Sequence, residues 1–237
     1  VCSSDLLGNQ DAITGANYQV KIYDAGTNAL LATSAFFTTS SVTVTDANLY
    51  CGRAYTVTAQ ATGINGGNGT FEIQSPVVST SKAADSGCNP SSLTISTGAD
   101  SNVRWNATTG TFDAITKGAA AVLNSETLRA RLQTGASGTS VTLNPSGYVI
   151  ISSPVTATPN ACGNLEVNAG ETINFSGAIN LSACTNTGSS IKATAAGYIY
   201  QNTTITTNAG ALTYLSNSEN GSGASAGNIY VTAASSI

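Results

Sequence analysis

The sequence predicts an all-β protein in two parts, a β-sandwich followed by a right-handed parallel β-helix with one short helix in front of it. Between residues 18 and 82, apolar and polar residues alternate with a period of two, which is typical of half-buried strands. From residue 141 onward, apolar positions return at intervals of 24 and 26 residues, which is typical of a solenoid. Residues 124–135 have the spacing of a helix.

The first part divides into short strands separated by turn residues. Tyr18, Val20 and Ile22 share one face of the first strand, and the polar residues 24–28 then turn the chain. The alternation continues in four further segments, at residues 29–38, 41–45, 54–61 and 70–80. The pattern predicts a sandwich domain over residues 1–82.

The segment from Leu49 to Ala59, LYCGRAYTVTA, resembles the end of a fibronectin type III repeat, in which a Leu, a Gly turn and a Tyr precede an alternating strand. The resemblance implies an Ig/fibronectin-III-like β-sandwich in which Tyr55 is a corner residue that satisfies a backbone group, which is a structural role. A complete module has two more strands where this chain has only 17 residues before Tyr18. We therefore expect the sandwich to be incomplete on its N-terminal side.

A change of composition follows the sandwich. The composition of residues 83–122 predicts a linker that contains two short strands, at residues 93–95 and 103–105. The helical segment comes next, with Asn124 or Ser125 as its cap and Gly135 as its end. Arg129 and Arg131 lie on the polar side of this short helix. They could clamp a ligand, but we favour the interpretation that they are solvated.

The strongest signal is an internal repeat in the second part. Three apolar positions recur together, first at Val141, Val149 and Val155, then at Leu165, Ile173 and Ile179, and again at Ile191, Ile199 and Ile205. A fourth pass starts at Leu212 and Tyr214, carries an insert, and resumes with Ile229, Val231 and Ile237. Three short strands in each repeat predict a parallel β-helix of about four coils over residues 123–237.

The amino-acid sequence of these coils is similar to that of filamentous-haemagglutinin-type bacterial surface proteins. The similarity is carried by residues 165–175 and 205–214, and by the small polar insert at residues 216–223. A short helix leading into the first coil also resembles their repeats. The resemblance implies an extracellular bacterial protein of the adhesin or fibre type.

Composition excludes several functional classes. The chain has 8 Lys and Arg, 12 Asp and Glu and no His, and its net charge is -4, so we expect no nucleic-acid partner. No run of 18 apolar residues is present, so we expect no membrane span. The absence of His removes the commonest general base and metal ligand.

The charged residues of the repeat do not predict an enzyme. They are Glu166, Glu171, Glu219 and Lys192, and no second carboxylate is expected one coil away from either Glu166 or Glu171. Turn chemistry explains the polar segments 24–28 and 100–102 better than calcium does. We therefore expect no catalytic residue, no cofactor and no metal site.

Five cysteines, at positions 2, 51, 88, 162 and 184, lack the C-x-x-C spacing of zinc and redox sites. We expect disulfides and a secreted, extracellular location. Cys162 and Cys184 are almost one coil apart, so their pairing would join stacked corners. Cys51 is expected to pair with Cys88, with Cys2 as the competing partner.

The leading functional expectation is a structural subunit or fragment of an extracellular bacterial fibre or adhesin. Its last coil and its incomplete sandwich both expose strand edges, so we expect a homopolymer that self-associates head to tail by strand pairing. The alternative is a carbohydrate-binding surface module that contacts surface glycans. The aromatic residues available for such a platform are Tyr198, Tyr200, Tyr214 and Tyr230.

Overall fold

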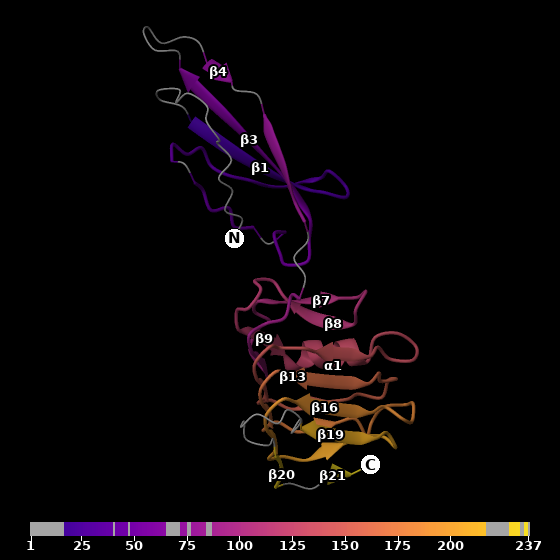
Figure 1. The fold of residues 1–237 in the computed structure, drawn as a ribbon. Coiled ribbons are helices and arrows are strands. Elements are labelled where there is room, and N and C mark those ends of the chain that lie inside the picture. The colour runs from indigo at the N-terminus through magenta and orange to yellow at the C-terminus, as the bar shows by residue number, and fades with distance from the viewer. Residues whose placement is uncertain are drawn as a thin grey trace. The chain divides into compact units, whose positions relative to one another are not determined.

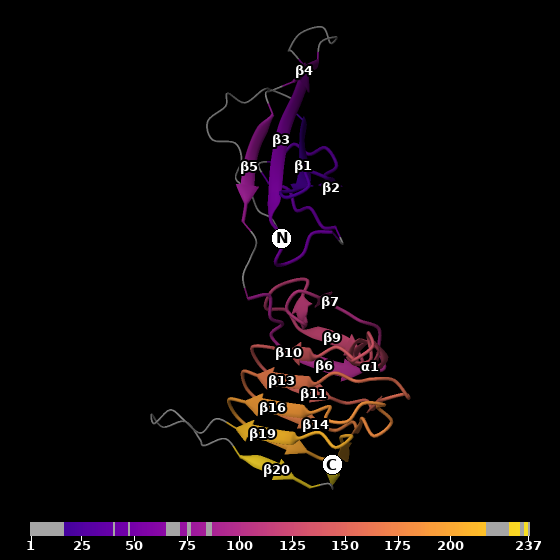
Figure 2. The same cartoon turned by 90° about the vertical axis from the view of Figure 1, so that its right-hand side faces the viewer.

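The computed structural model describes residues 17–39, 41–46, 48–64, 72–74, 77–83, 87–216, 228–232 and 235–236. The chain forms two compact units, Val1–Gly87 and Cys88–Ile237. Figures 1 and 2 show a small antiparallel sheet in the first unit and a stack of short strands in the second. Apart from one short helix, the regular structure of the described residues is β-strand, so the predicted all-β class is confirmed.

The first unit is an antiparallel sheet with the order β2-β1-β3-β4, in which β5 also pairs with β3. Its strands are β1 (Asn17–Asp24), β2 (Leu30–Thr33), β3 (Tyr55–Ile64), β4 (Glu72–Gln74) and β5 (Val78–Lys82). Val20 lies opposite Ala59, and Ile22 lies opposite Val57, so the predicted alternation places the apolar side chains of β1 and β3 on one buried face.

That buried face is covered by residues that follow β2. The side chains after β2 that pack on it are Phe37, Val42, Val44 and Leu49, and Leu31 of β2 itself also contributes. The structure has no regular strand at residues 41–46, where the alternation predicts one at residues 41–45. The alternation there arises because side chains pack on the sheet without joining its hydrogen-bond ladder. The expected N-terminal incompleteness concerns residues 1–16, which lie outside the described residues.

Tyr55 is the corner residue that the sequence predicts. Its hydroxyl accepts a hydrogen bond from the Tyr50 backbone nitrogen at 2.7 Å and donates one to the Tyr50 carbonyl at 2.9 Å. Its side chain is buried, so a ring that fills the core also satisfies two backbone groups at the bend. Tyr55 therefore has a structural role.

The second unit is a parallel β-solenoid of about 5 turns. Sheet I has the order β19-β16-β13-β10-β8-β7, sheet II the order β20-β17-β14-β11-β6-β9, and sheet III the order β12-β15-β18-β21. All strands pair in parallel except β7 and β8, which form an antiparallel hairpin.

The strands of the three sheets have the following bounds. Sheet I contains β7 (Val103–Asn106), β8 (Thr111–Ala114), β10 (Val141–Leu143), β13 (Leu165–Ala169), β16 (Ile191–Ala195) and β19 (Leu212–Ser216). Sheet II contains β6 (Leu93–Ser96), β9 (Ala121–Asn124), β11 (Val149–Ile151), β14 (Ile173–Phe175), β17 (Ile199–Gln201) and β20 (Ile229–Val231). Sheet III contains β12 (Val155–Thr156), β15 (Ile179–Asn180), β18 (Ile205–Thr206) and β21 (Ser235–Ser236).

The register of these strands confirms the internal repeat. In sheet II, Val149 lies opposite Ile173, which lies opposite Ile199. These side chains point inward and are completely buried, so the repeat is a stack of equivalent residues in one apolar interior. In the fourth pass, the position opposite Ile205 in sheet III is held by Ser235, whereas the repeat predicts Ile237, which lies outside the described residues.

The segment predicted as a linker, residues 83–122, is largely part of the solenoid. Leu93 in β6 lies opposite Val149 in β11, and on its other side it pairs with Ala121 in β9. The solenoid unit thus begins at Cys88 and has about 5 turns, whereas the sequence predicts about four coils from residue 123. The β7–β8 hairpin and the helix interrupt the first turns, which hides the repeat in the sequence.

The helix α1 (Ser125–Leu132) forms where the sequence predicts it. The Asn124 side chain caps it by accepting a hydrogen bond from the Glu126 backbone nitrogen at 2.8 Å, and its buried side packs on β12. The Arg129 Nε atom lies 2.7 Å from Oε2 of Glu126, and the Arg131 guanidinium lies 5.5 Å from the centre of the Trp105 ring. Both arginines are therefore engaged within the unit, and solvation alone does not describe them. The described residues contain no helix long and apolar enough to cross a membrane.

Candidate functional site

Tyrosine side chains gather on the outer face of sheet II. Because side chains alternate across a strand, each strand that buries its first and third residues turns the middle one outward. The outward row across β11, β14, β17 and β20 consists of Ile150, Asn174, Tyr200 and Tyr230. The residues just before these strands form a second row, which consists of Tyr148, Thr172, Tyr198 and Asn228.

Three of these residues form an aromatic cluster, which we call the tyrosine cluster (Tyr198, Tyr200 and Tyr230). The rings of Tyr200 and Tyr230 are stacked, with centroids 5.0 Å apart and planes 7° apart. Tyr198 lies 6.0 Å from Tyr200 and 6.3 Å from Tyr230 by ring centroids. Tyr230 is 43% exposed, so the cluster offers aromatic surface to solvent.

A groove of about 290 Å³ lies beside the tyrosine cluster. Its lining residues are Tyr148, Val149, Ile150, Glu171, Thr172, Asn174 and Tyr200. Both outward rows carry short polar side chains on the coil of β14, namely Thr172 and Asn174, and large side chains on the coils either side of it. The groove therefore arises from a change of side-chain size along the stack, on a regular backbone.

The polar groups of the groove are only partly used within the chain. Oδ1 of Asn174 accepts hydrogen bonds from Ser176 Oγ at 2.9 Å and from Asn202 Nδ2 at 3.1 Å. Within the described ranges, the Asn174 Nδ2 group has no hydrogen-bond partner, and the exposed Glu171 carboxylate forms no ion pair. Both a donor and an acceptor are therefore free to meet a ligand.

Tyr214, the fourth tyrosine predicted for a platform, is not part of the tyrosine cluster. Its ring stacks on Phe175 with centroids 5.9 Å apart and packs against the solenoid core. Its hydroxyl donates to Oε1 of the buried Gln201 at 2.7 Å, and burial raises the pKa of Tyr214 far above its ordinary value. The prediction is wrong for this residue because it occupies an inward position of β19.

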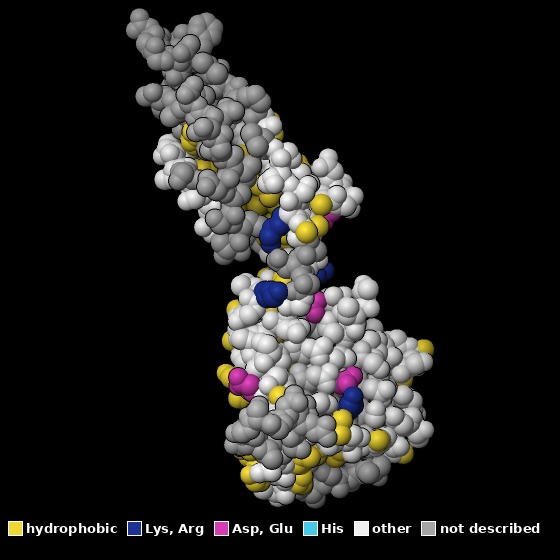
Figure 3. All heavy atoms as spheres, in the orientation of Figure 1, with side chains coloured by type: hydrophobic (Ala, Val, Ile, Leu, Met, Phe, Trp, Pro, Cys, Tyr) yellow, Lys and Arg dark blue, Asp and Glu magenta, His cyan; other side chains and the backbone are white. Residues whose placement is uncertain are grey.

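The charged residues predicted in the repeat, from residue 141 onward, have different surroundings. Glu166 and Lys192 lie opposite each other on β13 and β16, and Lys192 Nζ is 2.8 Å from Glu166 Oε1. Glu171 follows at the corner before β14, and Glu219 lies outside the described residues. Figure 3 shows that charged side chains are sparse on the face of the solenoid unit that it presents. The part of the chain that the structure describes brings no group of three His, Cys, Asp or Glu together in a metal-binding cluster.

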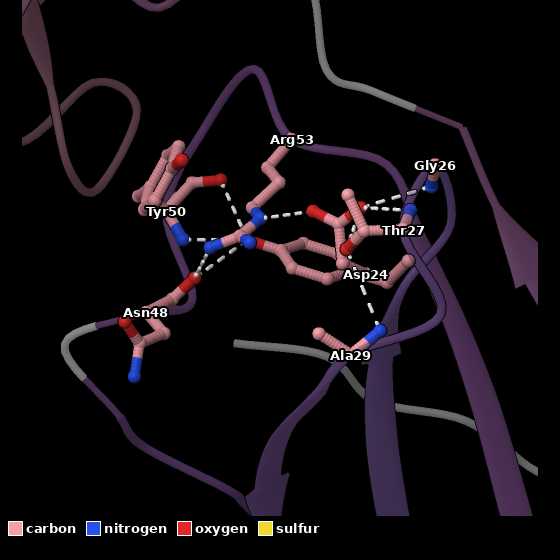
Figure 4. A network of polar contacts seen from close by, with 8 residues as sticks. Asp24, Gly26, Thr27, Ala29, Asn48, Tyr50 and Arg53 are labelled. Carbon is pink, nitrogen blue, oxygen red and sulfur yellow. Dashed lines mark hydrogen bonds and ion pairs between the residues drawn. The ribbon is translucent and has the colours of Figure 1, made fainter.

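The polar turn after β1 is organised around Asp24 (Figure 4). Its Oδ1 atom accepts hydrogen bonds from the backbone nitrogens of Gly26 and Thr27, at 2.9 and 2.8 Å, and its Oδ2 atom accepts one from Arg53 Nε at 2.7 Å. The Arg53 guanidinium, followed by the turn hydrogen bonds, lowers the pKa of Asp24 from 3.8 to about 2. The carboxylate thus works as a structural acceptor in the turn.

The second polar segment weighed for calcium, residues 100–102, is also a structural element. Asp100 accepts hydrogen bonds from the Asn124 backbone nitrogen at 2.6 Å and from Thr127 Oγ1 at 2.9 Å, which fixes the start of α1. Asn102 has a φ of 53° and its side-chain oxygen accepts from the Thr116 nitrogen at 2.6 Å. Both residues therefore organise loops in the first turns of the solenoid unit.

A second hollow, of about 380 Å³, lies on the solvent-facing side of the first unit's sheet. It is lined by Gln19, Lys21, Tyr23, Asn28, Thr56, Thr58, Gln60, Val77 and Ser79. Most of them are members of β1 and β3 that point to the side opposite the buried Val20 and Ile22. The hollow therefore lies on the less buried face of the sheet.

The disulfide predicted within the solenoid is present. Cys162 and Cys184 are joined, with their Cα atoms 5.6 Å apart and both side chains buried. Cys51 and Cys88 are also disulfide-bonded. Their pairing with each other stays a prediction, and the competing Cys2 lies outside the described residues.

Comparison of the chain with protein-family models, with curated proteins and with solved structures finds no match. The fold and the cysteines define the class of protein, a disulfide-containing β-solenoid with an antiparallel β-sheet module. Within that class, the groove beside the tyrosine cluster is the strongest candidate binding site, because it combines aromatic surface with free polar groups.

Proposed function

We propose that the chain is a structural segment of an extracellular bacterial fibre or adhesin of the filamentous-haemagglutinin type. Its ladders of parallel strands run through about 5 turns and enclose one apolar interior, an architecture that extends by adding coils. Two disulfides suit the oxidising environment outside a cell. Glu166, one of the two carboxylates that the structure describes in the coils from residue 141 onward, is held in an ion pair with Lys192, which favours a structural role for it.

The proposal of self-association rests on one observation at the coil of β19, β20 and β21. In β20, the inward positions Ile229 and Val231 are 42% and 54% exposed, whereas their partners on β17, Ile199 and Gln201, are fully buried. Each of the three strands is also the last one in its sheet among the described residues, and an edge strand presents unpaired backbone groups. We propose that a strand-bearing edge of a second copy covers this surface.

A contact between this edge and a different surface of the next copy would be heterologous, and such contacts repeat into filaments unless the rotation closes a ring. The test is sedimentation velocity of the purified chain over a range of concentrations, together with negative-stain electron microscopy. We expect larger species and filaments at high concentration. A single monomeric species at every concentration would contradict self-association.

A pair of matched variants locates the contact. Val231→Lys places a charge on the exposed coil edge and should reduce assembly, because burial of an unpaired ammonium group is unfavourable. Leu215→Lys makes the same kind of change on the outward side of β19, where the side chain is 48% exposed, and should leave assembly intact. Equal effects of the two variants would refute an edge-to-edge contact through β20.

A carbohydrate-binding surface module is the second candidate function. The tyrosine cluster and its groove favour it, since aromatic faces stack on sugar rings while amide and carboxylate groups meet hydroxyls. The two roles are compatible, because an adhesin needs both a scaffold and a binding surface.

A further inference from the structure

The aromatic stack on the outer face of sheet II ends at Tyr200, because the next residue of the outward row is Asn174. Tyr230 covers one face of the Tyr200 ring at a centroid distance of 5.0 Å, and β14 lies on the opposite side of β17. The other face of the Tyr200 ring is therefore turned towards β14, where the corresponding residue is Asn174. A side chain of this size leaves that aromatic face accessible from the groove.

We propose that this groove binds a neutral glycan, with one pyranose ring stacked on Tyr200 in the position that Asn174 leaves open. The inference rests on the second candidate function proposed above and deepens it by naming the charge of the glycan and the ring on which it stacks. It concerns the flank of the solenoid, whereas self-association concerns its edge. Tyr148 bounds the groove on the coil of β11 and Tyr200 bounds it on the coil of β17.

The dimensions suit a sugar ring. Neighbouring strands lie about 4.8 Å apart, so the rows of β11 and β17 are separated by about 9.6 Å along the stack. Tyr230 stacks on Tyr200 with ring centroids 5.0 Å apart. A sugar ring at the same distance on the other side of Tyr200 would lie midway between the two rows, over the side chains of Thr172 and Asn174. The groove volume of about 290 Å³ is just below the lower limit of about 300 Å³ for small-molecule sites, which suits a ligand of one or two sugar units.

The polar groups favour hydroxyls over other ligand chemistry. The free Nδ2 group of Asn174 can donate to a sugar oxygen, and the Glu171 carboxylate can accept from sugar hydroxyls through strong charge-assisted hydrogen bonds. A purely apolar ligand would cover these groups without satisfying them, which is unfavourable. The mixture of an aromatic wall with a polar floor thus points to a polyol that also has an apolar face.

The charge of the groove selects against acidic glycans. Glu171 is negative, and none of the described residues that line the groove is basic. A uronic acid or a sulfated sugar would meet a like charge there without a counter-ion. We therefore expect binding of neutral oligosaccharides and rejection of their acidic counterparts.

The decisive variant fills the open position. Asn174→Tyr should continue the stack of Tyr200 and Tyr230 and occupy the place of the sugar ring. The matched control is Asn180→Tyr, which makes the same change at an outward position of the same coil, but on sheet III. The side-chain oxygen of Asn180 also accepts from a serine two residues later, as that of Asn174 does. Circular dichroism and thermal unfolding of both variants establish that they are folded.

Binding is measured by saturation-transfer NMR and calorimetric titration with neutral disaccharides (cellobiose, maltose, lactose and chitobiose) and with digalacturonic acid. We expect at least one neutral disaccharide to bind the unaltered chain and Asn180→Tyr. Asn174→Tyr should abolish binding, and Tyr200→Ala should weaken it about tenfold, since the stacking contact is lost. Digalacturonic acid should not bind.

Four results would overturn the proposal. They are no binding of any neutral disaccharide, preferred binding of digalacturonic acid, unchanged binding by folded Asn174→Tyr, and an equal loss of binding in Asn174→Tyr and Asn180→Tyr. The assembly assay is independent of this test. Glycan binding by a strictly monomeric chain would refute self-association alone, and filaments that bind no disaccharide would refute the glycan site alone.

Discussion

The Nε atom of Arg53 lies 2.7 Å from Oδ2 of Asp24, and this ion pair joins the end of β1 to the residues just before β3. The Arg53 guanidinium also donates to the Asn48 carbonyl at 3.1 Å and lies 5.2 Å from the centre of the Tyr50 ring. Tyr50 is the residue whose backbone the Tyr55 corner holds. The pair therefore connects the turn after β1 with the corner that starts β3.

The first prediction concerns the pH dependence of this unit. The pKa of Asp24 is about 2 in the folded chain, below its ordinary value of 3.8, so the charged form is favoured by folding. Its contribution to stability is therefore complete above about pH 4 and is lost as the pH falls towards 2. We expect hydrogen exchange of β1 and β3 amides to accelerate in this window, and Asp24→Asn to remove part of that dependence.

The matched control for this prediction is Asp46→Asn, which removes another carboxylate of the same unit that accepts hydrogen bonds from Asn48. This variant should keep the acid-sensitive window of β1 and β3. If Asp24→Asn titrates in the same way as the unaltered chain, then the Arg53 pair does not carry the effect.

The second prediction concerns the close stacking of coils at Gly170. A Cβ atom at this position would overlap the carbonyl of Ser146 in the preceding coil, which is backbone and cannot move aside. We expect Gly170→Ala to lower the free energy of unfolding by about 1–3 kcal/mol, as overpacking does. Gly98→Ala, where the nearest group is the Ser96 hydroxyl at 3.2 Å, should change it by less than about 0.5 kcal/mol. Chemical denaturation of both variants measures the difference.

The repeat was predictable because sequence spacing and strand register coincide. A coil that contains no insertion returns each inward residue to the same place, so Val141, Leu165 and Ile191 stack in sheet I as their spacing predicts. The earlier turns were not predictable in this way. Leu93 and Val149 are partners across sheet II, but a hairpin and a helix lie between them in the sequence. Spacing identifies a solenoid only where the connections keep a constant length.

The groove was missed for a different reason. The inward residues carry the periodicity of the repeat, whereas the tyrosines stand out by residue type alone, which does not give their direction. Applying the same intervals to outward positions places Asn174 between Ile150 and Tyr200 and separates Tyr214 from the other tyrosines. The signal was therefore available in the register, whereas ring stacking and the depth of the groove depend on side-chain packing.

The third prediction concerns the disulfide between Cys162 and Cys184, which are 22 residues apart. Closing a loop of this length restricts the unfolded chain and contributes about 3 kcal/mol in the chain-entropy model. Replacing both cysteines with alanine should lower the free energy of unfolding of the solenoid by about this amount, as measured by urea denaturation. Alanine is preferred because serine would bury hydroxyl groups at both sites. A loss below about 1 kcal/mol would show that the cross-link constrains the unfolded chain little.

The fourth prediction concerns Thr194 on β16, which lies between Asn168 of β13 and Leu215 of β19. Its hydroxyl is buried and has no hydrogen-bond partner among the described residues. Such a group loses its hydration without compensation, which costs about 1–3 kcal/mol, whereas valine has a similar shape and no hydroxyl. We expect Thr194→Val to raise the free energy of unfolding, measured by urea denaturation, by about 1 kcal/mol. The control is Thr142→Val, at an outward position of β10 in the same sheet, which should change this free energy by less than about 0.5 kcal/mol. Destabilisation by Thr194→Val would show that the hydroxyl has a partner in the folded protein, and would refute this account of its burial.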